Sequence, residues 1–340
     1  MSKQWNVAVL GATGLVGEML LTVLQERHFP VGELFPLASA RSLGKTVRYN
    51  DRELPVIDAA SFDFARAQLG LFSAGGEVSA LHAPRAAAAG CVVIDNTSQF
   101  RYEPDIPLVV PEVNAPAIAQ YPARRIIANP NCSTIQMVVA LKPIYDAVGI
   151  ERINVATYQS VSGAGRRAVD ELADQTAHLL NGRPIQPKVV PKQIAFNCVP
   201  QIDRFMDNGY TKEEMKMHWE TQKIFADPRI RVNATAVRVP VFFGHSEAVH
   251  IETRERITAE AARELLARAP GVTVLDGRQA GSYPTAVSEA ANHDTVYVGR
   301  IREDMTHERG LDLWVVSDNI RKGAATNAVQ IAEILVREYL

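Results

Sequence analysis

The chain has 340 residues, of which 47% are hydrophobic and 22% charged, and its formal net charge is -2. This length suits two joined domains, and the near-neutral charge gives no reason to expect nucleic acid or an anionic membrane as a partner. No apolar run approaches the ~20 residues that a membrane span needs, and no signal peptide is expected before the first strand. Three cysteines without CxxC spacing argue against disulfides or a metal site, which predicts a cytoplasmic protein without metal.

The first part of the chain alternates strand-like and helix-like segments. The apolar run Trp5 to Leu10 predicts the first strand of a parallel sheet, and an amphipathic helix follows it directly. Alternation of this kind is typical of a doubly wound, Rossmann-like parallel sheet. Further strands are expected at 34–38, 69–73, 92–95 and 126–128, and helices at 78–89 and from residue 132.

From about residue 151 the strand-like runs become longer, which predicts an α+β domain with an open, mostly antiparallel sheet. Its strands are expected at 153–160, 235–239, 248–253, 295–301 and 311–316, and its helices at 168–180, 212–225 and 259–267. We expect segment 181–197 to be a loop at a subunit contact.

The expected domains follow from this change and from the last helix, 324–339, which is expected to pack on the first domain. They are a first domain of residues 1–131 completed by 320–340, and a second domain of residues 132–319.

A glycine-rich turn joins the first predicted strand to the first helix. Glycines in a strand-turn-helix context allow a tight turn and the close approach of a pyrophosphate, which then lies at the helix N-terminus. The spacing is GxxGxxG rather than the commoner GxGxxG, so a turn without a ligand is the alternative. The turn predicts cofactor contacts at Gly11, Thr13, Gly14, Leu15, Val16 and Gly17.

The end of the second predicted strand indicates which nicotinamide cofactor is bound. NAD sites tend to place Asp or Glu there for the ribose 2′-hydroxyl, whereas this chain has Ser39, Arg41 and Ser42. A guanidinium with flanking hydroxyls suits a 2′-phosphate, so NADP is predicted. The alternative is that Arg41 is a solvated surface residue.

The hexapeptide NPNCST at residues 129–134 places Cys132 at the expected start of a helix. Unpaired backbone N–H groups and the helix dipole favour a thiolate at this position. A thiolate together with a nicotinamide is suited to aldehyde and acyl chemistry through an enzyme thioester. The alternative for Cys132 is a small buried hydrophobic residue.

Three further places concentrate polar or small residues. The segment YQSVSGAG at 158–165 ends a strand in small residues, which suits the close approach of a cofactor or substrate. Arg238 lies in a predicted strand, and Gly244-His245-Ser246 is expected to form a turn before the next strand. Each has a plain alternative: a turn, a salt-bridged strand and an exposed histidine.

Together these segments resemble the aspartate-semialdehyde dehydrogenase family, in its shorter bacterial branch, over essentially the whole chain. Nine segments match in order: GATGLVG at 11–17, SAR at 39–41, IDNTSQFR at 94–101, VVPEVN at 109–114, NPNCST at 129–134, YQSVSGAG at 158–165, EEMKMHWETQKI at 213–224, RVPVFFGHSEAV at 238–249 and SDNIRKGAATNAVQIAE at 317–333.

The resemblance implies roles for matching residues. Cys132 is expected to be the nucleophile that forms the acyl-enzyme, and Gln159 to orient the acyl intermediate. His245 is expected to be the general acid/base, with a pKa near the unperturbed ~6.5. Ser162, Gly163 and Asn319 match positions near the nicotinamide.

The resemblance also implies the substrate contacts. Arg238 is expected to bind the α-carboxylate, Glu213 the ammonium, and the pair Arg101 and Lys216 the phosphate. A substrate with these three groups needs an arginine fork, an acid and a cationic phosphate cradle, and the chain offers each.

The expected function is therefore NADPH-dependent reduction of L-aspartyl 4-phosphate to L-aspartate 4-semialdehyde, in the biosynthesis of lysine through diaminopimelate, threonine, methionine and isoleucine. The family also implies that the first domain binds NADP, that the second serves catalysis and dimerisation, and that the protein is at least a homodimer. Two alternatives stay open: N-acetyl-γ-glutamyl-phosphate reductase, whose substrate has no ammonium for Glu213, and a catalytically silent paralogue that acts as a binding protein.

Overall fold

The computed structural model of the protein describes residues 3–340. The chain forms two compact units, one comprising the residues up to Asn131 together with Ala324–Leu340, the other comprising Cys132–Gly323. Each unit has its own six-stranded sheet. No helix among the described residues is long and apolar enough to cross a bilayer.

The first unit is built on a parallel sheet with the strand order β5-β2-β1-β6-β7-β8, and all five pairings are parallel. Numbered within the sheet, this is the order 3-2-1-4-5-6 of a doubly wound nucleotide-binding fold, which confirms the predicted fold class. The strands are β1 (Trp5–Leu10), β2 (Val31–Ala38), β5 (Ile57–Asp58), β6 (Leu69–Phe72), β7 (Val92–Asp95) and β8 (Ile126–Ala128).

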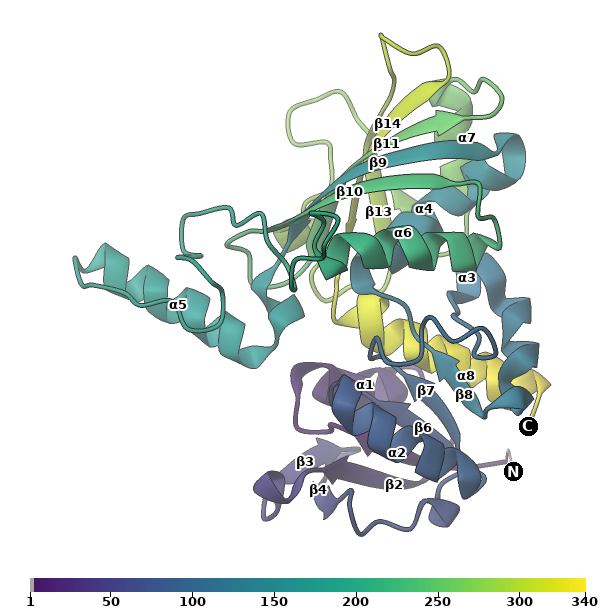
Figure 1. Ribbon diagram of the computed structural model, residues 1–340, viewed down its shortest axis with the longest axis vertical. Coiled ribbons are helices and arrows are strands. Elements are labelled where there is room, and N and C mark those ends of the chain that lie inside the picture. Colours follow the sequence, from purple (N-terminus) through teal and green to yellow (C-terminus); the bar gives the residue numbers. More distant parts are fainter. Residues whose placement is uncertain (1–2) are drawn as a thin grey trace. The chain divides into compact units, whose positions relative to one another are not determined.

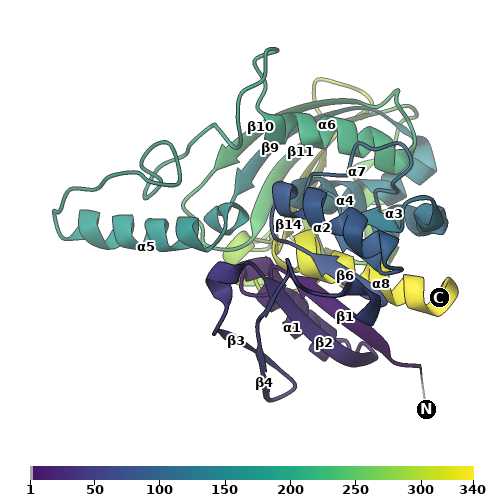
Figure 2. The same ribbon diagram turned by 60° about the horizontal axis from the view of Figure 1, so that its bottom comes forward.

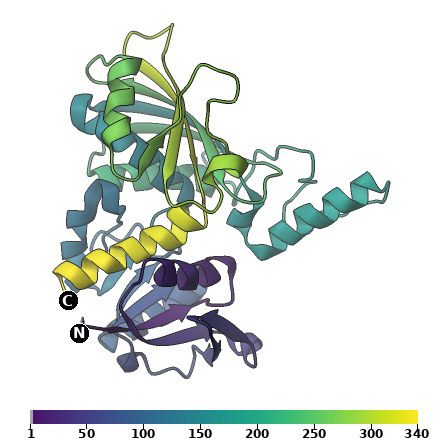
Figure 3. The same ribbon diagram turned by 180° about the vertical axis from the view of Figure 1, so that it is seen from behind.

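Helices cover this sheet, and the last one comes from the end of the chain. Helix α8 packs beside α1 (Figure 3), whereas α2 contacts β6 and β7. Val329 and Leu335 of α8 share one hydrophobic cluster with Val7 and Leu20, so the terminal helix completes this core. The helices are α1 (Leu15–Glu26), α2 (Gly76–Ala88), α3 (Pro111–Asn114) and α8 (Thr326–Glu338).

A hairpin that the sequence analysis did not expect follows β2. It pairs β3 (Thr46–Tyr49) with β4 (Arg52–Pro55) in antiparallel register. Asn50 and Asp51 connect the strands with φ of 46° and 59°. Two residues with positive φ form the turn type that suits the right-handed twist of a hairpin, and Asn and Asp adopt it more readily than most residues.

The second unit has a mixed sheet with the order β10-β9-β11-β14-β13-β12. The three inner pairings are antiparallel and the two outer pairings parallel, so the predicted mostly antiparallel sheet is confirmed. The strands are β9 (Ile150–Gln159), β10 (Arg231–Arg238), β11 (His245–Thr253), β12 (Val272–Val274), β13 (Val296–Glu303) and β14 (Gly310–Ser317).

Three helices pack on one face of the second sheet, and a fourth extends away from it (Figures 1 and 2). The packed helices are α4, α6 and α7, and the extended one is α5, which is followed by a segment without helix or strand at 181–197. The bounds are α4 (Cys132–Val148), α5 (Arg166–Leu180), α6 (Lys212–Phe225) and α7 (Ala259–Arg268).

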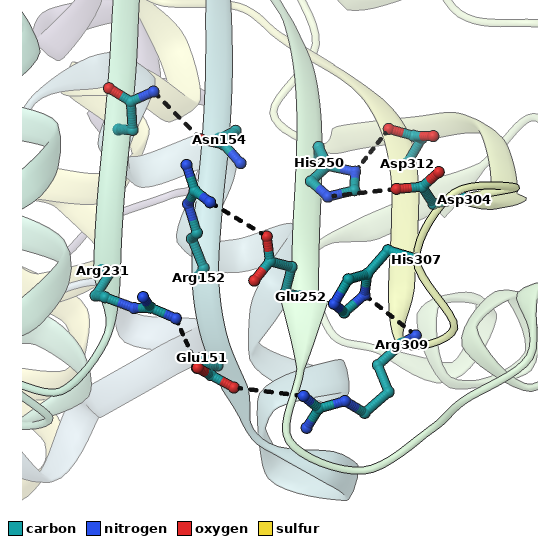
Figure 4. A network of polar contacts seen from close by, with 11 residues as sticks. Glu151, Arg152, Asn154, Arg231, His250, Glu252, Asp304, His307, Arg309 and Asp312 are labelled. Carbon is teal, nitrogen blue, oxygen red and sulfur yellow. Dashed lines mark hydrogen bonds and ion pairs between the residues drawn. The ribbon is translucent and has the colours of Figure 1, made fainter.

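The opposite face of the second sheet carries partly exposed polar side chains. Arg152 Nη1 of β9 lies 3.4 Å from Glu252 Oε1 of β11, and His250 Nδ1 lies 3.1 Å from Asp312 Oδ1 of β14 (Figure 4). Tyr158 near the end of β9 remains 39% exposed. Among the described helices of this unit, only the short π-helical turn Ala286–Ala290 packs on this face, against Trp314 and Val316, so the rest of the face is open to a partner.

Candidate active site

The glycine turn of the first unit joins β1 to α1 and presents backbone groups rather than side chains. A Cβ at position 17 would overlap the carbonyl oxygen of Gly11, so only glycine lets the helix start so close to the turn. Gly11 itself has a φ of 88°, which other residues rarely adopt. Gly14 caps α1, and its N–H donates to Gly11 O over 3.0 Å.

A cleft of about 470 Å³ opens beside this turn. Its lining unites the turn with the end of β2, as the sequence analysis predicted, and adds Asp58 from the end of β5. Of the predicted contacts it includes Gly11, Thr13, Gly14, Ser39, Arg41 and Ser42. Leu15, Val16 and Gly17 are not among the lining residues, because they already belong to α1.

Arg41 is an exposed residue of a short 3-10 turn, Ala40–Ser42, at the edge of this cleft. Its guanidinium makes no hydrogen bond or ion pair with the residues that the structure describes, so it is available to a ligand. A helix N-terminus with glycines and a guanidinium in one cleft fit the phosphates of a dinucleotide. Arg101 also lies in the first unit, buried, with Nη2 donating to Asn96 O over 2.7 Å.

In the second unit Cys132 is the first residue of α4 and is partly buried. Its Cβ lies where a side chain on Gly323 would go, since an added Cβ there would be 2.7 Å away. Gly323 belongs to a π-helical turn, Arg321–Ala325, a local geometry that is frequent at functional sites. The sequence analysis missed Gly323, and the cue was a lone glycine inside a helical segment.

Helix α6 brings an acid and a cation together. A capping box of Thr211 and Glu214 fixes its start, and Glu213 and Lys216 then lie one turn apart. Lys216 Nζ donates to Glu213 Oε2 over 2.9 Å and to Asp203 Oδ2 over 3.0 Å. Burial lowers the pKa of Lys216, but the two carboxylates outweigh burial and the net pKa is raised, so Lys216 stays cationic.

Gln159, the last residue of β9, connects the sheet to this helix. Its Nε2 donates to Glu213 Oε1 over 3.2 Å, and both side chains are buried. The structure thus unites three residues that the resemblance assigned to the site. Asp203, the second partner of Lys216, was missed because it lies in a loop without a recognisable motif.

His245 is the first residue of β11 and is completely buried, so both the predicted turn and the alternative of an exposed histidine are wrong. Its Nδ1 accepts a hydrogen bond from Ser160 N over 3.1 Å. A backbone N–H can only donate, so the neutral ring carries its proton on Nε2. Nε2 has no partner among residues 3–340.

The charge state of His245 differs from the expectation of a pKa near 6.5. Burial, reinforced by the positive charge of Arg238, lowers the pKa of His245 to about 3. The ring is therefore neutral at physiological pH, and Nε2–H is a hydrogen-bond donor in an enclosed site.

Arg238 is the common neighbour of the reactive groups. It is buried at the end of β10, and Nη1 donates to Ser160 O over 2.7 Å. Burial lowers its pKa, against the opposing effects of Glu213 and of the thiolate form of Cys132. A Cβ on Gly163 would lie 2.9 Å from this Nη1 and 3.3 Å from His245 Nε2, so a larger residue there would displace the guanidinium.

Asn319 follows β14 and holds the turn before His245. Its Oδ1 accepts from Gly244 N over 2.9 Å and from Ser160 Oγ over 3.0 Å, and its Nδ2 donates to Ser162 Oγ over 3.0 Å. All of these groups are buried. Asn319 and Ser162 thus lie beside His245, and Ser160 is an additional site residue that the sequence analysis named only within its segment.

No group of three or more His, Cys, Asp or Glu side chains able to hold a metal occurs within residues 3–340. The chemistry available is that of a thiol, an imidazole, a buried guanidinium and a Glu-Lys-Asp cluster. This set can bind an anionic amino-acid derivative and attack its acyl group.

Both units match models of one protein family. Residues 6–121 match the model described as semialdehyde dehydrogenase, NAD binding domain, and residues 141–322 the one described as semialdehyde dehydrogenase, dimerisation domain. Aspartate-semialdehyde dehydrogenase of Legionella pneumophila is 66% identical over 340 residues, which cover 100% of this chain and 98% of that protein.

Solved structures of aspartate-semialdehyde dehydrogenases are similar to this chain over nearly its whole length. Aspartate semialdehyde dehydrogenase II from Vibrio cholerae, complexed with ASA, has a TM-score of 0.98 and 64% identity, covering 100% of both chains. Aspartate semialdehyde dehydrogenase with NADP from Candida albicans has a TM-score of 0.76 and 25% identity, covering 98% of this chain and 99% of that one.

Proposed function

The chain belongs to the aspartate-semialdehyde dehydrogenase family, and on that premise we propose that it reduces L-aspartyl 4-phosphate to L-aspartate 4-semialdehyde with NADPH through a thioester on Cys132. It is an oxidoreductase of amino-acid biosynthesis that uses a pyridine nucleotide. The observation that carries the proposed mechanism is the buried Arg238, whose Nη1 lies against Gly163 together with Nε2 of His245, and whose charge acts on Cys132 and His245.

NADP(H) as the coenzyme is supported by the position of Arg41 and its serine neighbours in the cleft of the first unit. When bound, the coenzyme supplies the hydride. Ser162, Gly163 and Asn319 are proposed to lie near its nicotinamide, as the resemblance implied. Asp58 also lines this cleft, and we propose that Arg41 is the residue that selects the 2′-phosphate.

The substrate is held by charge. Arg238 is proposed to pair with the α-carboxylate, Glu213 with the ammonium, and Lys216 together with Arg101 with the phosphate. Lys216 is suited to this because its raised pKa keeps it positive, and Arg238 because a buried guanidinium can form a strong bidentate pair with a carboxylate.

The covalent steps use Cys132. Its thiolate attacks the acyl carbon of the substrate, the C–O bond to phosphate breaks, and phosphate leaves with the electron pair. Hydride addition to the thioester carbonyl gives a thiohemiacetal oxyanion, whose collapse breaks the C–S bond and restores the thiolate. Helix α4 and Arg238 both stabilise the thiolate.

His245 and Gln159 act on the oxyanion and the acyl group. In the neutral ring held by Ser160, Nε2–H is a donor that can stabilise the thiohemiacetal oxyanion. Pairing of Arg238 with the substrate carboxylate offsets the charge that depresses the pKa of His245, so substrate binding brings the ring closer to proton transfer. Gln159 orients the acyl intermediate.

The protein is a homodimer through its second unit, in keeping with the match to the dimerisation domain and with the polar side chains on the outer face of the sheet (Figure 4). A cytoplasmic location is part of the proposal. The two alternatives named above find no support, because the relatives are aspartate-semialdehyde dehydrogenases and the site retains Cys132, Gln159, Arg238 and His245.

The test is reduction of NADP by the purified protein given L-aspartate 4-semialdehyde, with and without inorganic phosphate. The proposal predicts reduction that depends on phosphate, since phosphate must release the acyl group from Cys132. Reduction at the same rate with N-acetyl-L-glutamate 5-semialdehyde, or none with either aldehyde, would contradict it.

A further inference from the structure

The second unit contains a buried carboxyl group that the proposed mechanism does not use. Glu247 lies on β11 two residues after His245, so the two side chains point to the same face of the sheet. It is completely buried, and neither carboxyl oxygen has a hydrogen-bond partner among residues 3–340. An ionised carboxylate without donors is strongly unfavourable in such a place.

Gln136 connects this strand to the nucleophile's helix. It lies four residues after Cys132 on α4, and it is almost completely buried. Its Nε2 lies 3.4 Å from both His245 O and Val315 O and donates to them. Because only the NH₂ group of the amide can donate to two carbonyls, the orientation of the Gln136 amide is fixed. The amide oxygen, Oε1, then has no hydrogen-bond donor among the described residues.

The two orphaned groups are neighbours, because Gln136 Nε2 donates to the carbonyl of Val315, the residue paired with Glu247 on the adjacent strand. Gln136 is the one polar side chain that contributes to the pKa of Glu247, which it lowers by less than burial raises it, and no nearby charge contributes. Burial raises this pKa well above the ordinary 4.5. The strands beside Glu247 present Thr157 and Val315 opposite it. On the helices that pack on this face the charged or titratable groups are Cys132, Lys142, Tyr145 and Asp146 of α4, Lys212, Glu213, Glu214, Lys216, His218, Glu220 and Lys223 of α6, and Glu260, Arg263, Glu264 and Arg268 of α7. His245 of β11 and Arg238 of β10 belong to the sheet itself.

The hydrogen-bonding groups of Glu247 and Gln136 indicate that Glu247 carries a proton. If Glu247 is ionised, three buried oxygens, its own two and Gln136 Oε1, are acceptors without a donor. A single proton on Glu247 supplies that donor and removes the buried charge at the same time. We propose that Glu247 is kept as a neutral carboxylic acid that donates to Gln136 Oε1, and that this pair positions Cys132 on α4 against the strand of His245.

A second buried carboxyl in the same unit shows the contrasting case. Glu171 on α5 accepts hydrogen bonds from the backbone N–H groups of Lys188, Val189 and Val190 over 2.7, 2.7 and 3.2 Å. Donors on every side suit an ionised acceptor. Glu171 is therefore the matched control for Glu247, since the same Glu-to-Gln change meets donors at one position and an acceptor at the other.

The kinetic test compares Glu247→Gln with Glu247→Leu and Gln136→Leu, and it rests on the proposed roles of Cys132 and His245. Glu247→Gln keeps an N–H donor for Gln136 Oε1 and should stay close to wild type. The two leucine variants should lower kcat by roughly 10–100-fold with KM nearly unchanged, as expected when reactive groups are displaced by a fraction of an ångström to an ångström. Equal losses in Glu247→Gln and Glu247→Leu would overturn the proposal, because they would mean that the negative charge matters.

A stability test does not depend on the leucine variants folding. A folded acid with a raised pKa keeps a proton that the unfolded chain releases above pH 4.5, so wild-type stability falls as the pH rises from there. Glu247→Gln has no such proton, so the thermal midpoint of this variant, measured relative to wild type, should rise from pH 5 to pH 8. Glu171→Gln, in which an amide replaces an acceptor that faces backbone N–H groups, should instead be less stable than wild type at both values.

A constant difference between Glu247→Gln and wild type across this range would show that Glu247 is ionised in the fold and would overturn the proposal. The stability test is independent of catalysis. A wild-type protein without phosphate-dependent activity would refute the proposed function but not the protonated pair, whereas an active protein with a constant stability difference would refute the pair alone.

Discussion

The coenzyme turn of the first unit and the polar cluster of the second are built in opposite ways. The turn occupies consecutive residues, and its main features are backbone N–H groups and glycines without side chains. The cluster collects buried side chains from β9, β10, β11, α4 and α6. A main-chain site keeps its chemistry in any surroundings, whereas the chemistry of a buried side-chain site is set by its neighbours, as the shifted pKa of His245 shows.

The largest effect should come from Cys132→Ala, which separates the two regions. Turnover should fall by about 10⁴-fold or more, since the nucleophile of a covalent mechanism is removed. NADPH binding, measured by fluorescence titration, should be unchanged because the turn lies in the other unit. Cys198→Ala, at an exposed position in the second unit, is the control and should keep full turnover. Retained turnover in Cys132→Ala would remove the covalent mechanism.

Two substitutions of His245 should separate a hydrogen-bond donor from a proton carrier. Asn can place its oxygen near Nδ1 and accept from Ser160 N, whereas Gln can place an N–H near Nε2. If Nε2–H stabilises the oxyanion, His245→Asn should lower kcat by roughly 10²–10³, and His245→Gln by clearly less.

The contrasting outcome for His245 is equal loss in both variants. A residue that transfers the proton would lose roughly 10²–10⁴ in kcat with either amide, because neither can change charge. A raised KM with unchanged kcat would instead make His245 a binding residue.

A smaller effect is expected in the coenzyme cleft. Arg41→Ala should weaken NADPH binding by about 1.5–3 kcal/mol, the scale of a hydrogen bond to a charged group, and should leave NADH binding nearly unaffected. Arg48→Ala, on an exposed arginine of β3 that pairs with Asp51, should change neither affinity. Equal losses of NADPH and NADH would show that Arg41 does not contact the 2′-phosphate.

The smallest effect is a pH dependence of stability that belongs to the cluster alone. Burial, with the charge of Arg238, lowers the pKa of His245 to about 3, so below its ordinary 6.5 only the unfolded chain takes up the proton. The contribution of the neutral ring to the stability of the fold is complete above pH 6.5 and is lost as the pH falls toward 3. Between pH 6.5 and 5, wild type should lose about 1–2 kcal/mol more stability than His245→Gln. Parallel losses would mean that His245 is charged in the fold.

The sequence predicted the coenzyme turn better than the polar cluster, because the turn is a local pattern and the cluster depends on contacts between separate segments. The turn and the alternation of strands are local patterns, and the parallel sheet of the first unit follows from them. Local pattern also placed Cys132 at the start of a helix. The environment of His245 could not be predicted, because it depends on Ser160 and Asn319, which are distant in sequence, and on how the segment from Arg238 to His245 folds back on itself.

What the sequence analysis missed lies mostly in contacts without a local pattern. Asp203 is a loop residue that completes the surroundings of Lys216, and Gly323 matters only because Cys132 packs against it. Glu247 follows a polar pair in the chain, and only the fold shows that it faces Gln136 without a donor. The β3–β4 hairpin, by contrast, had a local cue in Asn50-Asp51 that could have been used.

The most direct test of the central claim is the mass of the peptide that contains Cys132. The protein would be incubated with L-aspartate 4-semialdehyde and NADP without phosphate, quenched in acid and digested. The account predicts one aspartyl group on Cys132, lost when phosphate is added before the quench. An unmodified Cys132 peptide from protein that has reduced NADP in the same experiment would contradict it.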